Sequence, residues 1–346
     1  MQVVHIREHG SPDVLEIVDL PRPEPGSGEV LVRVLGVSVN HLDLWVRRGM
    51  PGLPIPMPRI PGCDGTGEIV ALGAGVQDAG LSVGQRVVLE PGYTTQPSPA
   101  VERGLDHLAD DYEIRGEHCD GFAREFVVLP AHYVLPLPDG VDPVQAAAVP
   151  LVFLTAWGLL HSRAKIQARE RVLVVAGSSG VGSAAIQIAK LAGCHVVATA
   201  GSDAKRALCR ELGADEVFDH YDEAWPKLVT GWSAGRGVDV VVEHVGPATW
   251  KGAMACLARN GRLVTCGGTT GPKVGLLLPH LFIKNLSVLG STMGPRNSLP
   301  KIFGHVAAGS LRPVVDRVMP LSQVKTAHQL LEDKSVSGKI VLIPGE

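Results

Sequence analysis

The chain lacks several features that mark whole classes of protein. Its 346 residues carry 32 Lys and Arg against 35 Asp and Glu, so no excess of positive charge points to nucleic acid as the main partner. It has no run of 18 apolar residues, and its N-terminus, MQVVHIREHGSPDVLE, has no apolar core of signal-peptide length. The six cysteines form no CxxC pair, which is typical of reduced thiols and not of a disulfide framework. These absences predict a cytoplasmic protein without a membrane span.

What is present indicates a globular chain of two domains. The hydrophobic fraction is 45% and the formal net charge is -3, a combination that excludes disorder. The length corresponds to roughly two domains of ~150 residues each. The chain has 41 glycines and 26 prolines, and these residues are distributed differently in its two halves.

The first 135 residues have the pattern of an irregular antiparallel β-barrel. Short Val-rich segments bounded by Gly or Pro predict strands at 28–34, 66–72, 85–91 and 123–130. Five prolines in Met50–Pro61 indicate a stiff surface loop, since proline at this density fits neither a helix nor a central strand. A second long loop, 91–120, is polar.

After residue 136, apolar strands alternate with helices. The helices are expected at 142–160, 181–191 and 203–213, and the strands at 171–177, 195–200, 215–219, 238–246, 261–268 and 286–292. This alternation predicts an α/β fold with a parallel, doubly wound sheet over 136–294. Two further helices and a closing strand in 295–346 are expected to complete the first domain.

The strongest motif is a glycine-rich turn between a strand and a helix. Gly177-Ser178-Ser179-Gly180-Val181-Gly182 follows RVLVVA and resembles the dinucleotide fingerprint, with Ser179 in place of the middle glycine. We expect Gly177 to permit the tight turn and Gly182 to let helix and strand pack closely, while the helix N-terminus attracts the pyrophosphate. The alternative is a plain strand–helix turn.

The end of the next strand indicates which cofactor is used. An NAD site places a carboxylate about 20 residues after the turn, but here Gly201 and Ser202 precede Lys205 and Arg206. Two cations after a small hydroxyl-bearing loop favour the 2′-phosphate of NADP over NAD. The alternative is that Ser202 merely caps the helix and the cations are solvated.

These segments together resemble the medium-chain dehydrogenase/reductase superfamily, closest to quinone oxidoreductases and alcohol-dehydrogenase-like members. The resemblance rests on GVSVNHLDLWVRRG, IPGCDGTGEIVALG, LTAWGLL, AGSSGVGSAAIQIAKLAG, ELGADEV and GSTMG. It implies a GroES-like catalytic domain over 1–135 and 295–346, a Rossmann domain over 136–294, and nicotinamide in the cleft between domains. It also implies a homodimer or homotetramer formed through the last Rossmann strand, Leu286–Thr292.

The resemblance also implies zinc in some members, but the ligand positions differ here. Where zinc alcohol dehydrogenases have Cys, His and Cys, this chain has Asn40, Cys63 and Leu151. Asp64 or His41 beside Cys63 does not complete three ligands of the kind zinc prefers. The four cysteines of the structural site fall near Thr95, Ser98, Val101 and Ala109, and the loop's single thiol, Cys119, lies outside them. We therefore expect neither zinc.

The family's cofactor contacts transfer to matching positions of this sequence. They place Thr155 at the nicotinamide pocket and His220 near the 2′-phosphate, where relatives have tyrosine. The full set of expected contacts is His41, Thr155, Gly177, Ser179, Gly180, Val181, Gly182, Gly201, Ser202, Lys205, His220, His244, Val245, Gly246, Gly267, Ser291 and Thr292.

The candidate catalytic residues are Asn40, Asp43, Cys63 and Asp64. Without zinc a substrate oxygen is polarised by hydrogen bonds, and the Asn40 amide is one donor; its alternative role is to hold the barrel turn. Asp43 either orients His41 or caps a helix. The sequence thus predicts an NADP(H)-dependent oxidoreductase acting on quinones or α,β-unsaturated carbonyls. The alternatives are an alcohol or aldehyde oxidoreductase and a nucleotide-binding protein without turnover.

Overall fold

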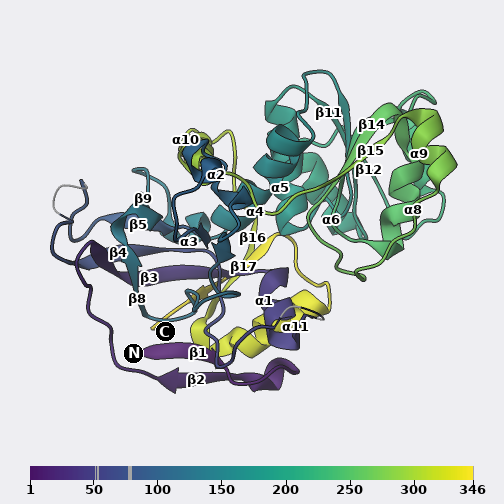
Figure 1. The fold of residues 1–346 in the computed structure, drawn as a ribbon. Coiled ribbons are helices and arrows are strands. Elements are labelled where there is room, and N and C mark those ends of the chain that lie inside the picture. The colour runs from purple at the N-terminus through teal and green to yellow at the C-terminus, as the bar shows by residue number, and fades with distance from the viewer. Residues whose placement is uncertain (51, 53, 77–79, 346) are drawn as a thin grey trace. The chain divides into compact units, whose positions relative to one another are not determined.

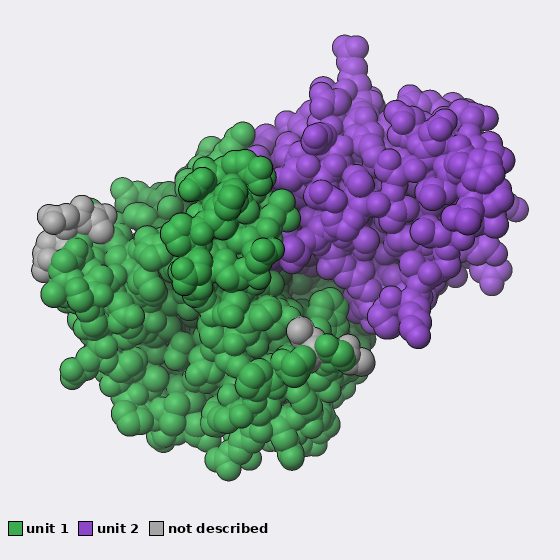
Figure 2. Space-filling model, in the orientation of Figure 1, with its two compact units in different colours: residues 1–151, 295–309, 313–346 green, residues 152–294, 310–312 purple. Residues whose placement is uncertain are grey.

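The computed structural model describes residues 1–50, 52, 54–76 and 80–345. Of the proline-rich segment 50–61, residues 51 and 53 lie outside the described residues. The chain divides into two compact units: residues 1–151, 295–309 and 313–346 form the first, and residues 152–294 with 310–312 form the second. Figure 2 colours the two units. The structure places residues 136–151 in the first unit, whereas the sequence pattern had assigned them to the second.

The first unit is built on a seven-stranded sheet (Figure 1). Its order is β16 (Val315–Pro320), β17 (Lys339–Ile343), β3 (Glu29–Val39), β4 (Gly65–Leu72), β5 (Arg86–Leu89) and β9 (Val134–Pro136), with β8 (Phe126–Pro130) also paired to β3. All pairs are antiparallel except β16 with β17. The long β3 covers the Val-rich segment predicted as a strand at 28–34, and its Val30, Val32 and Val34 are buried in the core.

Smaller elements surround this sheet. They are the strand pairs β1 (Gln2–Ile6) with β2 (Leu15–Asp19) and β6 (Gly92–Tyr93) with β7 (Glu113–Ile114), and the helices α1 (His41–Arg48), α2 (Pro99–Glu102), α3 (Pro143–Ala146), α10 (Leu299–Ala307) and α11 (Val324–Glu332). The closing strand β17 lies directly beside β3, with Ile340 opposite Val39. The start of β17 therefore adjoins the point where β3 leads into α1.

The second unit is a six-stranded parallel sheet flanked by helices (Figure 1). The strand order is β12 (Glu216–Phe218), β11 (His195–Thr199), β10 (Arg171–Val174), β13 (Val238–Glu243), β14 (Leu257–Thr265) and β15 (Ser287–Gly290). The helices are α4 (Pro150–Trp157), α5 (Gly180–Leu191), α6 (Asp203–Glu211), α7 (Trp225–Trp232), α8 (Pro247–Ala255) and α9 (Leu278–Lys284). This is the 3-2-1-4-5-6 order of a Rossmann sheet, so the predicted doubly wound architecture is confirmed.

The core of this unit explains why the strands read as continuous apolar runs. Leu173, Val197 and Val241 on one face of the sheet pack against Trp225 of α7 and Trp250 of α8. Val172, Val174 and their neighbours point to the other face and are equally buried. A sheet covered on both faces has no polar side to alternate with. Among the described helices, none is long and apolar enough to cross a membrane.

Candidate functional site

The expected cofactor residues of the second unit gather at one edge of its sheet. The segments 177–182, 201–202, 244–246, 267 and 291–292 each follow the carboxyl end of a strand, and His220 follows β12. Because all six strands are parallel, these segments share one edge. The order reverses between β10 and β13, which is where open α/β sheets bind nucleotides.

The sequence predicted that Gly177 permits the tight turn after β10, and the structure differs on this point. The left-handed residue is Ala176, at φ 52, and Gly177 does not have a positive φ. The Gly177 amide donates to the Thr199 carbonyl at 2.8 Å. A Cβ on Gly177 would lie 2.9 Å from Cys209 Sγ and Ile186 Cδ1. Gly177 is therefore required for close packing of the sheet and its helices, and Ala176 makes the turn.

The start of α5 has the form of a phosphate cradle. Ser179 caps the helix, with its hydroxyl accepting from the Gly182 amide at 3.0 Å and hydrogen-bonded to His244 Nε2 at 2.9 Å. A Cβ on Gly182 would lie 2.4 Å from the Ala176 carbonyl oxygen, so only glycine lets the turn lie this close to the helix. A glycine-lined turn at a helix N-terminus fits the diphosphate of a nicotinamide dinucleotide.

The residues after β11 were interpreted in two ways from the sequence, as a site for the 2′-phosphate of NADP or as a plain helix cap. The Ser202 hydroxyl accepts from the Lys205 amide at 3.3 Å and so caps α6, which agrees with the second interpretation. Arg206 is paired with Asp203 at 2.5 Å and Asp219 at 2.9 Å, so this cation is already neutralised within the protein. These two ion pairs argue against the expectation that Arg206 serves a 2′-phosphate.

The ring of His220 defines the space beside this tip. A Cβ on Gly201 would lie 2.9 Å from His220 Nε2 and 2.4 Å from a ring carbon of Tyr221. Glycine at 201 therefore leaves room for two rings at the end of β12. Tyr221 is 67% exposed, and its ring meets that of His220 edge-on with centroids 4.7 Å apart.

A carboxylate that sequence reasoning missed shapes the turn after β13. Glu243 is fully buried and accepts hydrogen bonds from the amides of Val245 and Gly246 and from the Thr249 hydroxyl. Burial raises its pKa. The only sequence signal was an acidic residue at the end of an apolar strand. By closing this turn, Glu243 fixes the segment that carries His244 toward Ser179.

Thr155 lies on α4, and residues 267 and 291–292 follow the last two strands of the sheet, β14 and β15. Thr155 on α4 is buried, and its hydroxyl lies 3.8 Å from Met293 Sδ. The Ser291 amide donates to the Thr265 carbonyl at 2.9 Å, and the Thr265 hydroxyl donates to the Gly267 carbonyl at 3.2 Å. Residues 267 and 291 are thus held next to each other where β14 and β15 end.

The four candidate catalytic residues of the first unit form one buried cluster with a fifth. Asn40, Asp43, Cys63, Asp64 and Lys339 are each no more than 4% exposed; we call them the buried polar cluster. Asn40 Nδ2 donates to Asp64 Oδ1 at 3.0 Å, to Ser38 O at 3.2 Å and to Cys63 Sγ at 3.2 Å. The amide hydrogens of Asn40 are thus directed into the protein, which favours the turn-holding role over the substrate-polarising one.

Asp43 is a helix cap and not a partner of His41. Its Oδ2 accepts from the Asn40 amide at 2.7 Å in a capping box, and its Oδ1 accepts from the Gly62 amide at 2.8 Å. Burial raises the Asp43 pKa to about 6, although both hydrogen bonds oppose the shift. Burial also lowers the pKa of His41 to about 4, so its imidazole is neutral at pH 7.

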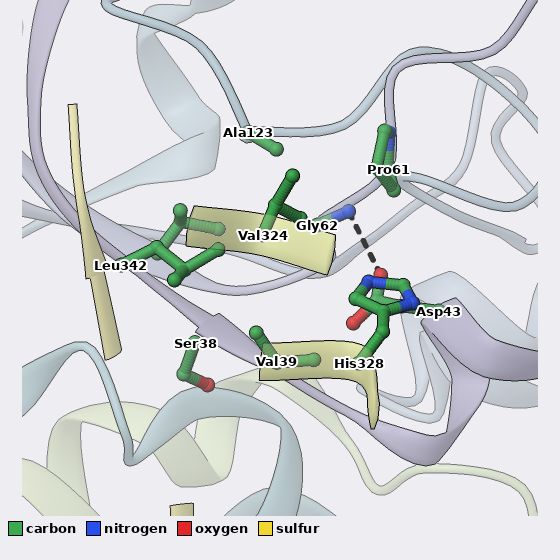
Figure 3. A pocket seen from close by; sticks show the side chains of 10 residues that line it. Ser38, Val39, Asp43, Pro61, Gly62, Ala123, Val324, His328 and Leu342 are labelled. Carbon is green, nitrogen blue, oxygen red and sulfur yellow. Dashed lines mark hydrogen bonds between the residues drawn. The ribbon is translucent and has the colours of Figure 1, made fainter. Parts of the chain in front are cut away.

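A small cavity borders this cap. Figure 3 shows Asp43 bonded to Gly62, with Ala123, Val324 and His328 around the same space. The cavity is no larger than one water molecule and is mostly lined by carbon. It is therefore a packing defect beside the cap and too small to receive a substrate.

Comparisons with known proteins agree with this architecture. The alcohol dehydrogenase GroES-like domain matches residues 26–139, and the zinc-binding dehydrogenase family matches residues 180–308. A quinone oxidoreductase of Pseudomonas aeruginosa is 32% identical, with 99% of each chain covered. A zinc-type alcohol dehydrogenase-like protein of Schizosaccharomyces pombe is 30% identical over 91% of this chain and 90% of its own. A solved NAD-dependent alcohol dehydrogenase is 42% identical, with a TM-score of 0.96 and full coverage of both chains.

The chain belongs to the medium-chain dehydrogenase/reductase superfamily. Its two units are accordingly the GroES-like and Rossmann-type parts of an NAD(P)-dependent oxidoreductase. The resemblance inferred from the sequence is confirmed at this level.

The donor set at the catalytic zinc position of this superfamily does not suit zinc. Leu151 offers no side-chain ligand, and its backbone amide donates to Asp64 Oδ2 at 3.2 Å. Asn40 donates its amide hydrogens to Cys63 and Asp64, and burial raises the pKa of the Cys63 thiol, which keeps the thiol protonated. Zinc prefers thiolate and imidazole. Within the described residues, no three His, Cys, Asp or Glu side chains gather as a metal site.

The loop at the structural zinc position is held by other contacts. The Asp111 carboxylate accepts from the amides of Thr95 and Gln96 at 2.6 and 2.8 Å, and Ser98 caps α2. The Arg115 guanidinium lies 4.6 Å from the ring centre of Tyr93 and 5.5 Å from that of Tyr133. Hydrogen bonds and cation–π contacts therefore order this loop.

Proposed function

We propose that this oxidoreductase transfers hydride from NADPH to quinones or α,β-unsaturated carbonyls without a catalytic zinc. The observation that carries the proposal is the set Asn40, Cys63 and Leu151 at the positions that hold zinc in zinc-dependent members. Oxidation of a simple alcohol requires an alkoxide, which a metal ordinarily generates. Electron-poor acceptors do not need this activation, so they suit such a site better.

The reaction balances with these reactants. Bound NADPH supplies a hydride from nicotinamide C4, and solvent supplies a proton. An enone gains the hydride at its β-carbon and the proton at its α-carbon, whereas a quinone gains both and becomes a hydroquinone. In this proposal, the turn at 177–182 binds the cofactor diphosphate. Asn40, Asp43, Cys63 and Asp64 set the polar environment of the first unit's site.

A panel of substrates tests the proposed reaction. We expect NADPH oxidation with 1,4-benzoquinone and with an alkenone, unchanged by prolonged chelation, and little NADP⁺ reduction with primary alcohols. Faster turnover of alcohols or aldehydes would support the alternative that the alcohol dehydrogenase relatives suggest. Cofactor binding with no turnover across quinones, enones, aldehydes and alcohols would instead favour a nucleotide-binding protein.

We propose NADP(H) as the preferred cofactor. The residues directly after β11, Ala200, Gly201 and Ser202, carry no carboxylate, and Lys205 follows three residues later. Arg206 is paired with two aspartates, and Lys205 is the cation of the sequence motif that we assign to a 2′-phosphate. NAD is the alternative, and the solved relative named for NAD makes it a necessary comparison.

Replacing Lys205 tests this preference. We expect K205A to raise the KM for NADPH between about tenfold and about a hundredfold, as loss of a charge-assisted bond predicts, and to leave the KM for NADH unchanged. The control is K227A on the exposed side of α7. A wild-type kcat/KM that is tenfold higher with NADH would overturn the assignment.

We also propose that the protein forms a homodimer or homotetramer through the edge of its Rossmann sheet. Strand β15 pairs only with β14 among the described strands, so its outer side is open. The neighbouring helix α9 and the residue before it expose Leu277, Leu278 and Phe282 at 71%, 63% and 67%. An open strand edge beside exposed apolar side chains is typical of an interface.

The cysteines support the proposed cytoplasmic location. All six are free thiols, and four of them, Cys63, Cys194, Cys209 and Cys256, are buried as small apolar side chains. Such thiols suit a reducing compartment.

A further inference from the structure

Glu243 is a fully buried acidic side chain at the edge of the Rossmann sheet where the expected cofactor residues gather. It ends β13, directly before the turn at 244–246. Burial raises its pKa, and the hydrogen bonds that it accepts oppose the shift. A carboxylate at such depth is tolerated where several donors compensate for its desolvation. Its donors therefore show which part of the site it holds in place.

The Glu243 carboxylate closes the turn that follows β13. Its Oε1 accepts from the Val245 amide at 3.0 Å and from the Thr249 hydroxyl at 2.6 Å. Its Oε2 accepts from the Gly246 amide at 3.0 Å. A carboxylate has only acceptors, so both of its oxygens suit these donors, whereas a glutamine would bring its own NH₂ group against the Gly246 amide. The charged form of Glu243 thus fixes the backbone of the turn.

The same turn is hydrogen-bonded to the loop after β14. The His244 carbonyl accepts from the Thr269 hydroxyl at 3.1 Å. The Val245 carbonyl accepts from the amide and the hydroxyl of Thr270 at 2.8 and 2.7 Å. This loop begins with the segment that contains Gly267, one of the expected cofactor contacts. The turn held by Glu243 is therefore tied to a second part of the expected cofactor site.

On its other side the turn contacts the phosphate cradle through the His244 ring. His244 Nε2 is hydrogen-bonded to the Ser179 hydroxyl at 2.9 Å, and the same hydroxyl accepts from the Gly182 amide at 3.0 Å. These two bonds fix the Ser179 side chain at the start of α5. Ser179 stands where the dinucleotide fingerprint has the glycine that lets the backbone approach the pyrophosphate. The orientation of this extra hydroxyl therefore bears on how the cradle receives a diphosphate.

We propose that Glu243 is a positioning residue for the cofactor and acts through His244 on the Ser179 hydroxyl of the phosphate cradle. By closing the turn at 244–246, its carboxylate sets the place of the His244 ring, and the ring fixes the hydroxyl. The inference rests on the proposed binding of the cofactor diphosphate at 177–182. Since the turn is also bonded to the loop after β14, the diphosphate end and the nicotinamide end of the proposed cofactor site share one support.

A series of single variants follows this order of contacts. T249V removes one donor to the carboxylate and keeps the shape of the side chain, and E243Q removes the charge. H244L removes the bond to Ser179, and S179G installs the glycine of the fingerprint. The matched control is E223Q, which removes an exposed carboxylate of the same unit. The Kd is measured for NADPH, for NADH and for ADP-ribose, which has the diphosphate but no nicotinamide, and the Tm is recorded in parallel.

We expect T249V, E243Q and H244L each to raise the Kd between about twofold and about tenfold, as loss of one hydrogen bond predicts. This applies to the dinucleotide that the wild type binds more tightly. The Kd for ADP-ribose should rise by a similar factor, because the effect reaches the cradle. In turnover, the KM for the dinucleotide should rise while kcat stays nearly unchanged. E223Q should keep the wild-type Kd and Tm.

Double variants test whether Glu243 and His244 act through Ser179. In the S179G background, E243Q and H244L should leave the Kd for ADP-ribose unchanged, because the hydroxyl on which they act is gone. Effects that simply add would overturn the inference, and so would a wild-type Kd for ADP-ribose in folded E243Q. T249V carries the same test if E243Q does not fold.

The outcomes also separate this inference from the proposed function. A wild type that does not bind ADP-ribose would refute the proposed diphosphate site and the inference with it. Absence of quinone and enone turnover, with the expected changes of Kd intact, would refute the proposed reaction alone.

Discussion

Gly182 provides the sharpest test of the cofactor turn. A Cβ at this position would stand 2.4 Å from the Ala176 carbonyl oxygen and 2.9 Å from Gly177 Cα, both of them backbone atoms. Because real Cβ contacts essentially never fall below 3.0 Å, the G182A substitution has to displace the turn from α5 by about 0.6 Å or more. The backbone amides that the turn would present to a diphosphate move with it.

The magnitude follows from those amides. A hydrogen bond to a charged group contributes about 1.5–3 kcal/mol, and 1.4 kcal/mol corresponds to tenfold in Kd. Loss of one such bond should therefore weaken NADPH binding between about tenfold and about a hundredfold. The Tm should fall as well, since the strained turn also caps α5 through Ser179.

Binding is measured by titration calorimetry or by fluorescence of the reduced cofactor, together with the Tm of each variant. The control is G231A in α7, where a Cβ would meet nothing within 4 Å and φ is not positive. This control should keep the wild-type Kd and a Tm equal to or slightly above that of the wild type. A folded G182A protein with wild-type affinity would show that the turn does not carry the diphosphate.

Two further predictions concern stability and assembly. Burial raises the pKa of Glu90 to about 7. Ionisation of Glu90 therefore opposes folding. The stability that the protonated side chain contributes is present at low pH and is lost as pH rises from about 4.5 to about 7. Urea unfolding should therefore show wild type losing about 2–3 kcal/mol relative to E90Q between pH 5 and pH 8; equal differences at the two pH values would contradict this. The F282D substitution on α9 should lower the mass measured by light scattering to that of a monomer, whereas L108D at an exposed site of the first unit should not. A wild-type mass that F282D leaves unchanged would exclude this edge as the interface.

Local sequence patterns predicted the Rossmann unit well because its signals are local. The strands of 171–177 and 195–200 are buried on both faces and read as apolar runs, and Ser179 and Ser202 lie where helices begin. The boundary at 136 was less well defined, since α3 packs on β3 and β4 through contacts that no local pattern reveals. Similarly, the glycine pattern of the motif did not show that the residue with positive φ in the turn is Ala176. It also did not show that Gly177 is needed for close packing.

The first unit's site resisted prediction for a different physical reason. Asn40 and Asp43 are three residues apart, and Cys63 and Asp64 precede β4, so their proximity could be inferred from the family pattern. Lys339 stands about 300 residues from Asn40 in the chain, and only the antiparallel register of β17 on β3 brings it there. In the sequence it is one lysine before the apolar run IVLI, where an exposed strand end would be the ordinary interpretation. Its ammonium donates to the Val39 carbonyl and to Asn40 Oδ1, so it is part of the hydrogen-bonded network of the buried polar cluster. Sheet register fixes this contact between distant residues, and no local pattern shows it, so the sequence could predict the position of the cluster but not all of its members.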